Sequence, residues 1–189
     1  MRSLLFLLLF APLFIVASGS AYELTDGTAL DRATGLMWQR GMADRPMSHR
    51  DAERYCRDLS LESRDDWRLP ELSELRTLIV GCAGSRPGGA CPVDAGSGGC
   101  GGGGCLHSKC YDKNNCACAE GKGPGENGRY QATGVWRGAE SRFWSATGRD
   151  DCPGSAWRVN FLKGAVGYDE RHNLNAVRCV REEGTGAKR

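Results

Sequence analysis

Ten cysteines among 189 residues constrain the fold of this chain more than any other feature. The chain opens with Arg2, an apolar run from Leu4 to Ala17, and then small residues. That order is typical of a secretory signal peptide. Because exported proteins fold where thiols are oxidised, an even number of cysteines predicts disulfides rather than free thiols. We therefore expect an exported protein, periplasmic or extracellular, that disulfide bonds stabilise.

The sequence divides into a leader, one domain and a tail. The small residues that end the leader place cleavage after Ala21, or after Gly19, so residues 1–21 are assigned to the signal peptide. The apolar run is too short for a comfortable membrane span, and we expect no stable membrane insertion after cleavage. Residues 22–182 fit one domain of ordinary size, and residues 183–189 form a polar tail.

The charges are almost balanced, with 25 Lys and Arg against 23 Asp and Glu. Nucleic-acid-binding domains usually carry a basic excess or a basic stripe. The overall balance shows no such excess, so we expect no nucleic-acid partner.

A first helix is predicted from Ser48 to about Leu59. Ser48 and Asp51 have the pattern of a capping box, in which the two ends of the first turn bond each other. An apolar stripe at helical spacing follows, at Ala52, Tyr55, Cys56 and Leu59. We expect this stripe to face the core, and His49 in the first turn to be an exposed polar residue.

A second helix is predicted after a charged turn that carries Trp67 and Leu69 as apolar anchors. Pro70 suits the first helical position, because its missing N–H would have no intrahelical partner there. The apolar residues that follow lie at helical spacing, at Leu72, Leu75, Leu78 and Ile79. This helix is expected to dock on the core as a scaffold element.

Strands are predicted before and after the helices. Turn signals divide residues 23–40 into a hairpin or two short strands. Apolar and polar residues alternate in residues 157–161, which is the period of a half-buried strand. Residues 143–147 and 176–181 are further strand candidates.

Residues 81–128 form a glycine- and cysteine-rich insert between the second predicted helix and the strand candidate at residues 143–147. Eleven of the 24 residues from Gly81 to Gly104 are glycine, and seven of the ten cysteines lie between Cys82 and Cys118. The glycines keep no three-residue period, which excludes a collagen triple helix. A segment so poor in apolar residues cannot bury a core of its own. We expect a loop whose shape disulfides set.

Several separated motifs, in order along the chain, resemble the Lcl C-terminal domain family. That domain ends a bacterial collagen-like adhesin and occurs in many exported proteins. The resemblance spans nearly all of the chain after the leader except the insert. The stretches that carry it are Leu30–Gln39, Tyr55-Cys56, Asp66–Pro70 with Glu74-Leu75, Phe143–Ser145, Ala156–Val159 with Phe161 and Gly164, and Val177–Arg181.

The resemblance implies an α+β, C-type-lectin-like fold, with two helices packed on small, mostly antiparallel sheets and the chain ends close together. It also implies a disulfide from the first helix to the last strand, Cys56 to Cys179, which would contribute about 4 to 5 kcal/mol in the chain-entropy model. The remaining cysteines allow many pairings, which we leave open: Cys82, Cys91, Cys100, Cys105, Cys110, Cys116, Cys118 and Cys152.

Metal sites have weak support in the sequence. C-type lectins bind calcium through Glu-Pro-Asn or Gln-Pro-Asp and Trp-Asn-Asp motifs, and none occurs here. The clusters at Asp150-Asp151, Asp169-Glu170 and Asn173–Asn175 are interpreted as solvated loops. Zinc ligands from the insert, between Cys105 and Cys118 and including His107, would depart from the usual Cys-x2-Cys spacing. We expect no metal and no cofactor.

Catalysis has no recognisable motif either. The three histidines, His49, His107 and His172, lie in no nucleophile motif such as Gly-x-Ser-x-Gly. Formylglycine-generating enzymes have a related fold and use cysteines, but their arrangement is not recognisable here. We expect a protein that is not an enzyme. The alternative is an exported enzyme or metal-binding protein that uses the insert cysteines.

The tryptophans suggest where a ligand could bind. Trp38, Trp67, Trp144 and Trp157 occupy family-motif positions and are assigned to the core. Trp136 lies outside the motifs, beside the insert, and we choose it with Arg137 as the ligand contact. Its burial in the core is the alternative.

The predicted function is that of a non-catalytic binding module of the bacterial cell envelope or exterior. Its partner would be a polysaccharide or an envelope protein, since the resemblance to the adhesin implies attachment to polysaccharides. The ligand surface is expected on the 81–128 insert and neighbouring loops. A purely structural envelope protein is a further alternative.

Overall fold

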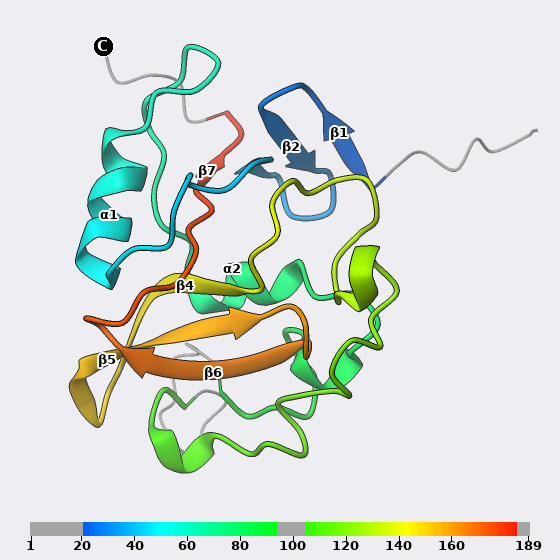
Figure 1. Cartoon of the computed structure of the whole chain (residues 1–189), viewed down its shortest axis with the longest axis vertical. Coiled ribbons are helices and arrows are strands. Elements are labelled where there is room, and N and C mark those ends of the chain that lie inside the picture. Colours follow the sequence, from blue (N-terminus) through cyan, green and yellow to red (C-terminus); the bar gives the residue numbers. More distant parts are fainter. Residues whose placement is uncertain (1–20, 94–104, 185–189) are drawn as a thin grey trace, which may run out of the picture.

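The computed structural model of the chain describes residues 21–93 and 105–184 (Figure 1). The signal-peptide assignment up to residue 20, the middle of the insert with Cys100, and the end of the polar tail lie outside these ranges. Within them, two α-helices and two small antiparallel sheets confirm the predicted α+β class. The elements are β1 (Tyr22–Leu24), β2 (Thr28–Asp31), β3 (Leu36–Gln39), α1 (His49–Asp58), α2 (Leu72–Thr77), the 3-10 helices η1 (Ala83–Ser85), η2 (Ser108–Cys110) and η3 (Glu126–Gly128), β4 (Arg142–Arg149), β5 (Cys152–Asn160), β6 (Ala165–Glu170) and β7 (Val180–Glu182).

The first sheet has the order β1-β2-β3-β7, so the two ends of the domain lie in one sheet. Its central pair places Leu30 opposite Met37, and β3 then pairs Trp38 with Val180 of β7. The predicted strand at 176–181 is shorter than expected. Residues before Val180 instead bond to neighbouring loops, as where the Ala43 N–H donates to the Val177 carbonyl at 3.0 Å.

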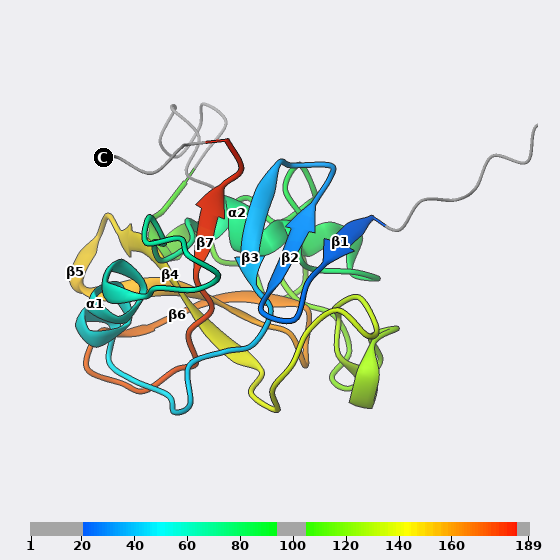
Figure 2. The ribbon, with the colours of Figure 1, turned by 90° about the horizontal axis from the view of Figure 1, so that it is seen from above.

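The second sheet has the order β4-β5-β6. Figures 1 and 2 show α2 in the middle of the molecule, between this sheet and the first one. The facing side chains alternate as the sequence predicts, so Trp157 and Val159 are fully buried while Arg158 between them is not. They pack with Leu72, Leu75 and Leu78 of α2 into the main core.

The start of α2 differs from the prediction. The helix begins at Leu72, and Pro70 lies before its cap rather than at its first position. Glu71 is the N-cap, and its side chain and that of Glu74 bond reciprocally across the first turn. The two glutamate side chains thus accept from backbone N–H groups of the first turn, which have no partner within the helix.

Arg76 of α2 anchors the insert to the helix. Its guanidinium is 1% exposed and donates to the backbone carbonyls of Ser85 at 2.7 Å and Arg86 at 2.8 Å. It also bonds the carbonyls of Cys91 and Val93. These bonds add to the packing of Cys82, Cys91, Val93 and Cys116 of the insert in the main core.

The disulfide between Cys56 and Cys179 joins α1 to the closing segment of the chain. Both sulfurs are fully buried in a second core cluster with Trp67, Leu69 and Trp144. Close by, Arg181 donates two hydrogen bonds to the Asp66 carboxylate at 2.6 and 3.0 Å. In the described ranges, no helix is long and apolar enough to cross a membrane.

Candidate ligand-binding groove

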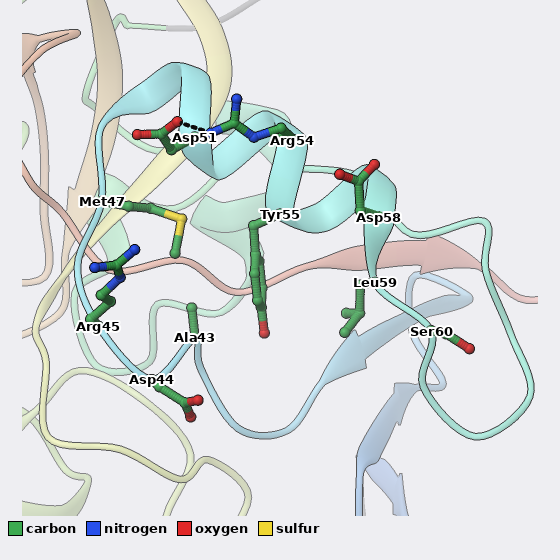
Figure 3. Close-up of a pocket in the computed structure, with 10 residues that line it drawn as sticks. All are labelled: Ala43, Asp44, Arg45, Met47, Asp51, Arg54, Tyr55, Asp58, Leu59 and Ser60. Carbon is green, nitrogen blue, oxygen red and sulfur yellow. Dashed lines mark hydrogen bonds and ion pairs between the residues drawn. The ribbon is translucent and has the colours of Figure 1, made fainter.

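A groove of about 540 Å³ runs between α1 and the loop that precedes it (Figure 3). This volume lies within the usual range for small-molecule sites in proteins. The floor consists of Ala43, Met47, Tyr55 and Leu59, and the rim consists of Asp44, Arg45, Asp51, Arg54, Asp58 and Ser60. We call these ten residues the α1 groove.

The floor is apolar and only partly covered. Tyr55 and Leu59 point from α1 toward Ala43 and Met47 on the preceding loop (Figure 3). Ala43 is buried, while Met47, Tyr55 and Leu59 are half-buried. The predicted stripe of α1 therefore splits, because Ala52 and Cys56 enter the core whereas Tyr55 and Leu59 face the groove.

Local bonds fix both walls of the groove. Ser48 is the N-cap of α1, and its side-chain oxygen accepts from the Asp51 N–H at 3.3 Å. On the other wall, the Met47 N–H donates to the Asn175 carbonyl at 2.9 Å, and the Asn175 N–H returns a bond of 3.2 Å. The groove is thus held by a capped helix and by backbone bonds to a distant segment.

The Tyr55 hydroxyl is positioned through the framework. It accepts from Gln39 Nε2 at 2.9 Å, while Gln39 Oε1 accepts from the Cys179 N–H at 3.2 Å. Cys179 in turn is bonded to Cys56, next to Tyr55 in α1. Because the hydroxyl accepts this bond, its own proton remains to donate to a ligand.

Charges of both signs alternate around the rim. Arg54 pairs with Asp51, which Figure 3 marks as a dashed line. Asp44, Arg45, Arg54, Asp58 and Ser60 are exposed. Carboxylates accept from hydroxyl groups and guanidinium groups donate to them, so the rim can bond a ligand rich in hydroxyls.

His49, predicted to be exposed, is buried at 1% exposure. Its Nε2 lies 2.9 Å from the Ser145 carbonyl, and its Nδ1 lies 2.9 Å from Nη1 of Arg171. Since an arginine only donates, Nδ1 accepts and Nε2 carries the proton. Burial first, and then the Arg171 charge, hold the pKa of His49 below its usual value. The residue ties α1 to β4 and to the turn after β6.

Trp136 and Arg137, chosen from the sequence as ligand contacts, lie on the other side of the first sheet. Trp136 is half-buried, with its ring edge-to-face to Tyr22 at 5.4 Å and to Trp38 at 6.4 Å. The Arg178 guanidinium carbon lies 4.5 Å from its ring centre. Arg137 is exposed and pairs with Asp26 at 2.9 Å. The other four tryptophans are buried, as predicted.

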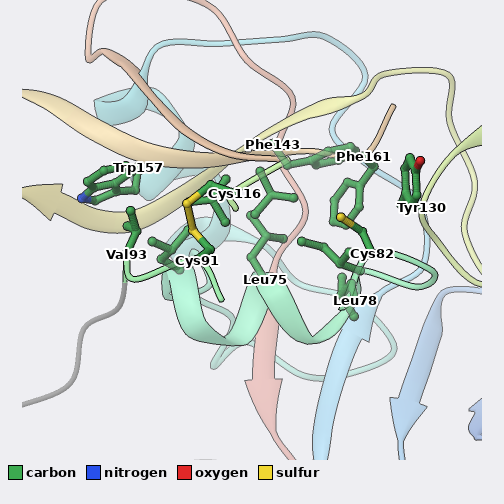
Figure 4. Packing of buried hydrophobic residues seen from close by; sticks show 14 of the residues in the cluster. Leu75, Leu78, Cys82, Cys91, Val93, Cys116, Tyr130, Phe143, Trp157 and Phe161 are labelled. Carbon is green, nitrogen blue, oxygen red and sulfur yellow. A yellow bond between two sulfur atoms is a disulfide. The ribbon is translucent and has the colours of Figure 1, made fainter. Parts of the chain in front are cut away.

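Six insert cysteines form disulfides, Cys82 with Cys118, Cys91 with Cys116, and Cys105 with Cys110. Figure 4 shows the Cys91–Cys116 bond inside the core, between α2 and the second sheet. These sulfurs are therefore not thiolates that could bind zinc. Cys152 is bonded to no cysteine among the described residues, and Cys100 lies outside them.

The acidic clusters considered for calcium are engaged in internal contacts. Asp169 accepts from the side chains of Asn173 and Asn175 at 2.5 and 3.4 Å. Asp151 pairs with Arg149 at 2.7 Å and accepts from the Ser108 N–H at 3.1 Å. The described residues contain no group of three or more histidine, cysteine or acidic side chains placed to hold a metal ion.

The remaining histidines make single contacts with acidic side chains. His107 Nδ1 lies 3.4 Å from Asp151, and His172 Nε2 lies 3.3 Å from Glu170. Ser108, next to His107, bonds Asp151 through its hydroxyl rather than His107. A serine nucleophile needs its base on the hydroxyl itself, so this set is not arranged for nucleophilic catalysis.

No sequence pattern indicates the α1 groove directly. The one available signal is the width of the apolar stripe predicted for α1. Tyr55 carries a polar hydroxyl and Leu59 lies at the helix end, so these two positions suit a partly exposed surface better than the core. The loop wall, Ala43 to Met47, reaches its place through bonds to Asn175 and Val177, which no local pattern predicts.

Comparison with known proteins gives one match. The family model described as the Lcl C-terminal domain matches residues 27–181. Neither a curated protein nor a solved structure matches the chain, so the likeness to C-type-lectin folds rests on the sequence resemblance alone. The matched range includes both helices, both sheets except β1 and the last residue of β7, and every residue of the α1 groove. The chain therefore belongs to the Lcl C-terminal domain family.

Proposed function

We propose that this protein is a non-catalytic binding module that recognises a hydroxyl-rich glycan in the α1 groove. The observation that carries the proposal is the combination of a half-buried apolar floor with a rim of alternating charge. Sugar rings present apolar C–H faces and hydroxyl edges. The ring of Tyr55 and the thioether of Met47 suit the faces, and the rim suits the edges.

The balance of charge on the rim favours an uncharged sugar over a polyanion. Asp44, Asp51 and Asp58 outnumber Arg45 and Arg54, and Arg54 is already paired. A polyanion would meet like charges, which disfavour binding. A neutral sugar can accept from the guanidinium groups and donate to the carboxylates.

The surroundings support binding rather than chemistry. The groove holds no histidine and no cysteine among its lining residues. Its rigidity comes from the Cys56–Cys179 bond, the Gln39 bridge and the Ser48 cap, and rigid walls reduce the entropy lost on binding.

Four disulfides in the described chain are typical of exported proteins. Within that class, we place the module in the periplasm or outside the cell, where glycans of the envelope or of a surface are accessible. An envelope protein that carries such a glycan is an equally suitable partner.

Glycan-array screening of the secreted protein, followed by calorimetry with the best neutral hit, tests the proposal. We expect Arg45→Ala to weaken binding about tenfold, which is the loss of one charge-assisted hydrogen bond. Arg57→Ala is the matched control, since Arg57 lies on α1, is exposed and does not line the groove. Equal effects of the two variants, or no glycan hit, would contradict the proposal.

A further inference from the structure

A second pocket, of about 500 Å³, lies beside β1 at the far edge of the first sheet. It shares no lining residue with the α1 groove. Its walls are mostly small or apolar, and include Tyr22, Val80, Pro87 and Ala132. We call it the Tyr22 pocket.

One cation stands at the entrance of the Tyr22 pocket. Arg86 lines it and is exposed, and no described residue forms a hydrogen bond or an ion pair with its guanidinium group. Its backbone carbonyl accepts from Arg76 at 2.8 Å, so the position of the main chain is fixed while the side chain stays available. The one acidic lining residue, Asp31, already accepts from the Ala33 N–H at 2.9 Å.

A second cation lies behind the pocket wall. Tyr22 packs edge-to-face on Trp136, and Arg178 lies on that same ring, with its guanidinium carbon 4.5 Å from the ring centre and 5.3 Å from that of Phe143. Arg178 is 2% exposed and donates to the Arg137 carbonyl at 3.2 Å. Its Nε and Nη1 atoms have no partner among the described residues.

The charge of Arg178 is therefore not balanced by a carboxylate in the described part of the chain. Burial lowers its pKa to about 9. Burial also raises the pKa of Tyr22 to about 12, with a smaller contribution from Asp31, while Arg86 and Arg178 act in the opposite direction. Arg86 and Arg178 thus both act on Tyr22 against the larger effect of Asp31. A buried cation without a counter-charge, as at Arg178, favours the arrival of an anion.

We infer that the Tyr22 pocket binds a small organic acid, with its apolar body against Tyr22 and its carboxylate on Arg86. The apolar lining excludes a bare inorganic anion as the best ligand, because it would leave most of the pocket wall without a partner. A purely apolar ligand would make no use of Arg86, whereas a carboxylate can accept hydrogen bonds from it. This inference does not depend on the proposed glycan binding, since the two sites are separate.

Calorimetry of the secreted protein with benzoate, benzyl alcohol and sodium sulfate tests the inference. We expect benzoate to bind at least about tenfold more tightly than either of the others, because only benzoate carries both a ring and a carboxylate. Arg86→Gln should weaken benzoate binding about tenfold and leave benzyl alcohol unchanged. The matched control, Arg57→Gln, should change neither.

Several results would overturn the inference. They are no benzoate binding, equal affinity for benzoate and benzyl alcohol, and benzoate affinity that Arg86→Gln leaves unchanged. Sulfate binding as tight as benzoate would show a simple anion site and would also overturn it. Arg86 is exposed at the surface, so its replacement is compatible with folding, which the thermal melt of the variant checks.

Discussion

Two buried arginines on the closing segment of the chain occupy opposite electrostatic surroundings. Arg181 and Arg178 are both 2% exposed. Arg181 binds the Asp66 carboxylate with two hydrogen bonds, beside the Cys56–Cys179 disulfide. Arg178 lies on Trp136 and Phe143 and bonds one backbone carbonyl. One region pairs its buried charge, and the other does not.

The difference separates a region built for stability from one that carries an electrostatic cost. Around Arg181, the ion pair with Asp66, the Cys56–Cys179 disulfide and the packed tryptophans all stabilise the fold. We call this region the framework, and it also positions the α1 groove. Around Arg178, the field of an unbalanced cation reaches the wall of the Tyr22 pocket. Stability measurements should therefore respond strongly to changes in the first region and weakly in the second.

The largest effect is expected from the framework disulfide. Replacing Cys56 and Cys179 by serine opens a link across 123 residues and should lower the free energy of unfolding by about 5 kcal/mol. Removing Cys105 and Cys110 opens a link across only 5 residues and should cost about 2 kcal/mol. Chemical denaturation of both double variants gives the comparison, and equal losses would contradict it.

Removing the partner of Arg181 should have the next largest effect. Asp66→Ala takes away the carboxylate that holds this buried guanidinium and should lower the free energy of unfolding by about 2 to 3 kcal/mol. Asp26→Ala is the control, because Asp26 pairs with the exposed Arg137 and is itself almost fully exposed. Surface pairs contribute about 0 to 1 kcal/mol. Similar losses in the two variants would remove the contrast between framework and surface.

The pH dependence of folding stability tests the part that His49 plays in the framework. Its pKa is lowered in the folded protein, so the unfolded chain binds the proton more readily. This contribution to stability is fully present above the unfolded pKa of about 6.5 and is lost as the pH falls below it. His49→Gln should reduce that acid-side loss, whereas His172→Gln, at an exposed site, should not. Melting temperatures of the two variants, measured as the pH falls through about 6.5, check both expectations.

The smallest effect is expected where the charge is unbalanced. Arg178→Met removes a buried cation without breaking an ion pair in the described chain, so stability should change by less than about 1 kcal/mol or rise. Thermal and chemical unfolding measure it. A loss above about 2 kcal/mol would mean that Arg178 stabilises the fold as Arg181 does, and the comparison would fail.

Local sequence patterns predicted most of the framework. The Ser48 cap and the buried positions of Ala52 and Cys56 follow from helix chemistry, and the end of β5 follows from the alternation in residues 157–161. The error at His49 came from treating a first-turn histidine as polar surface. His49 lies three residues before Ala52 and seven before Cys56, so its burial was readable from helical spacing.

The sites depend on contacts between distant segments and could not be predicted in the same way. The insert docks through Arg76, while three disulfides join its own segments to one another. The loop wall of the α1 groove docks on residues 175–177. Trp136 was chosen because it lies outside the family motifs. Its contacts with Tyr22, Trp38 and Arg178 join three separate parts of the chain, which spacing does not reveal.

A map of backbone amide chemical shifts, recorded as the best neutral glycan is titrated into the protein, tests the central claim most directly. We predict that the largest shifts fall on the loop from Ala43 to Met47 and on residues 54–60, at and just after the end of α1, around the α1 groove. The sequence prediction placed the ligand surface on the insert and at Trp136. Shifts confined to residues 105–128 or to Trp136 and Arg137 would contradict the groove and support that earlier expectation.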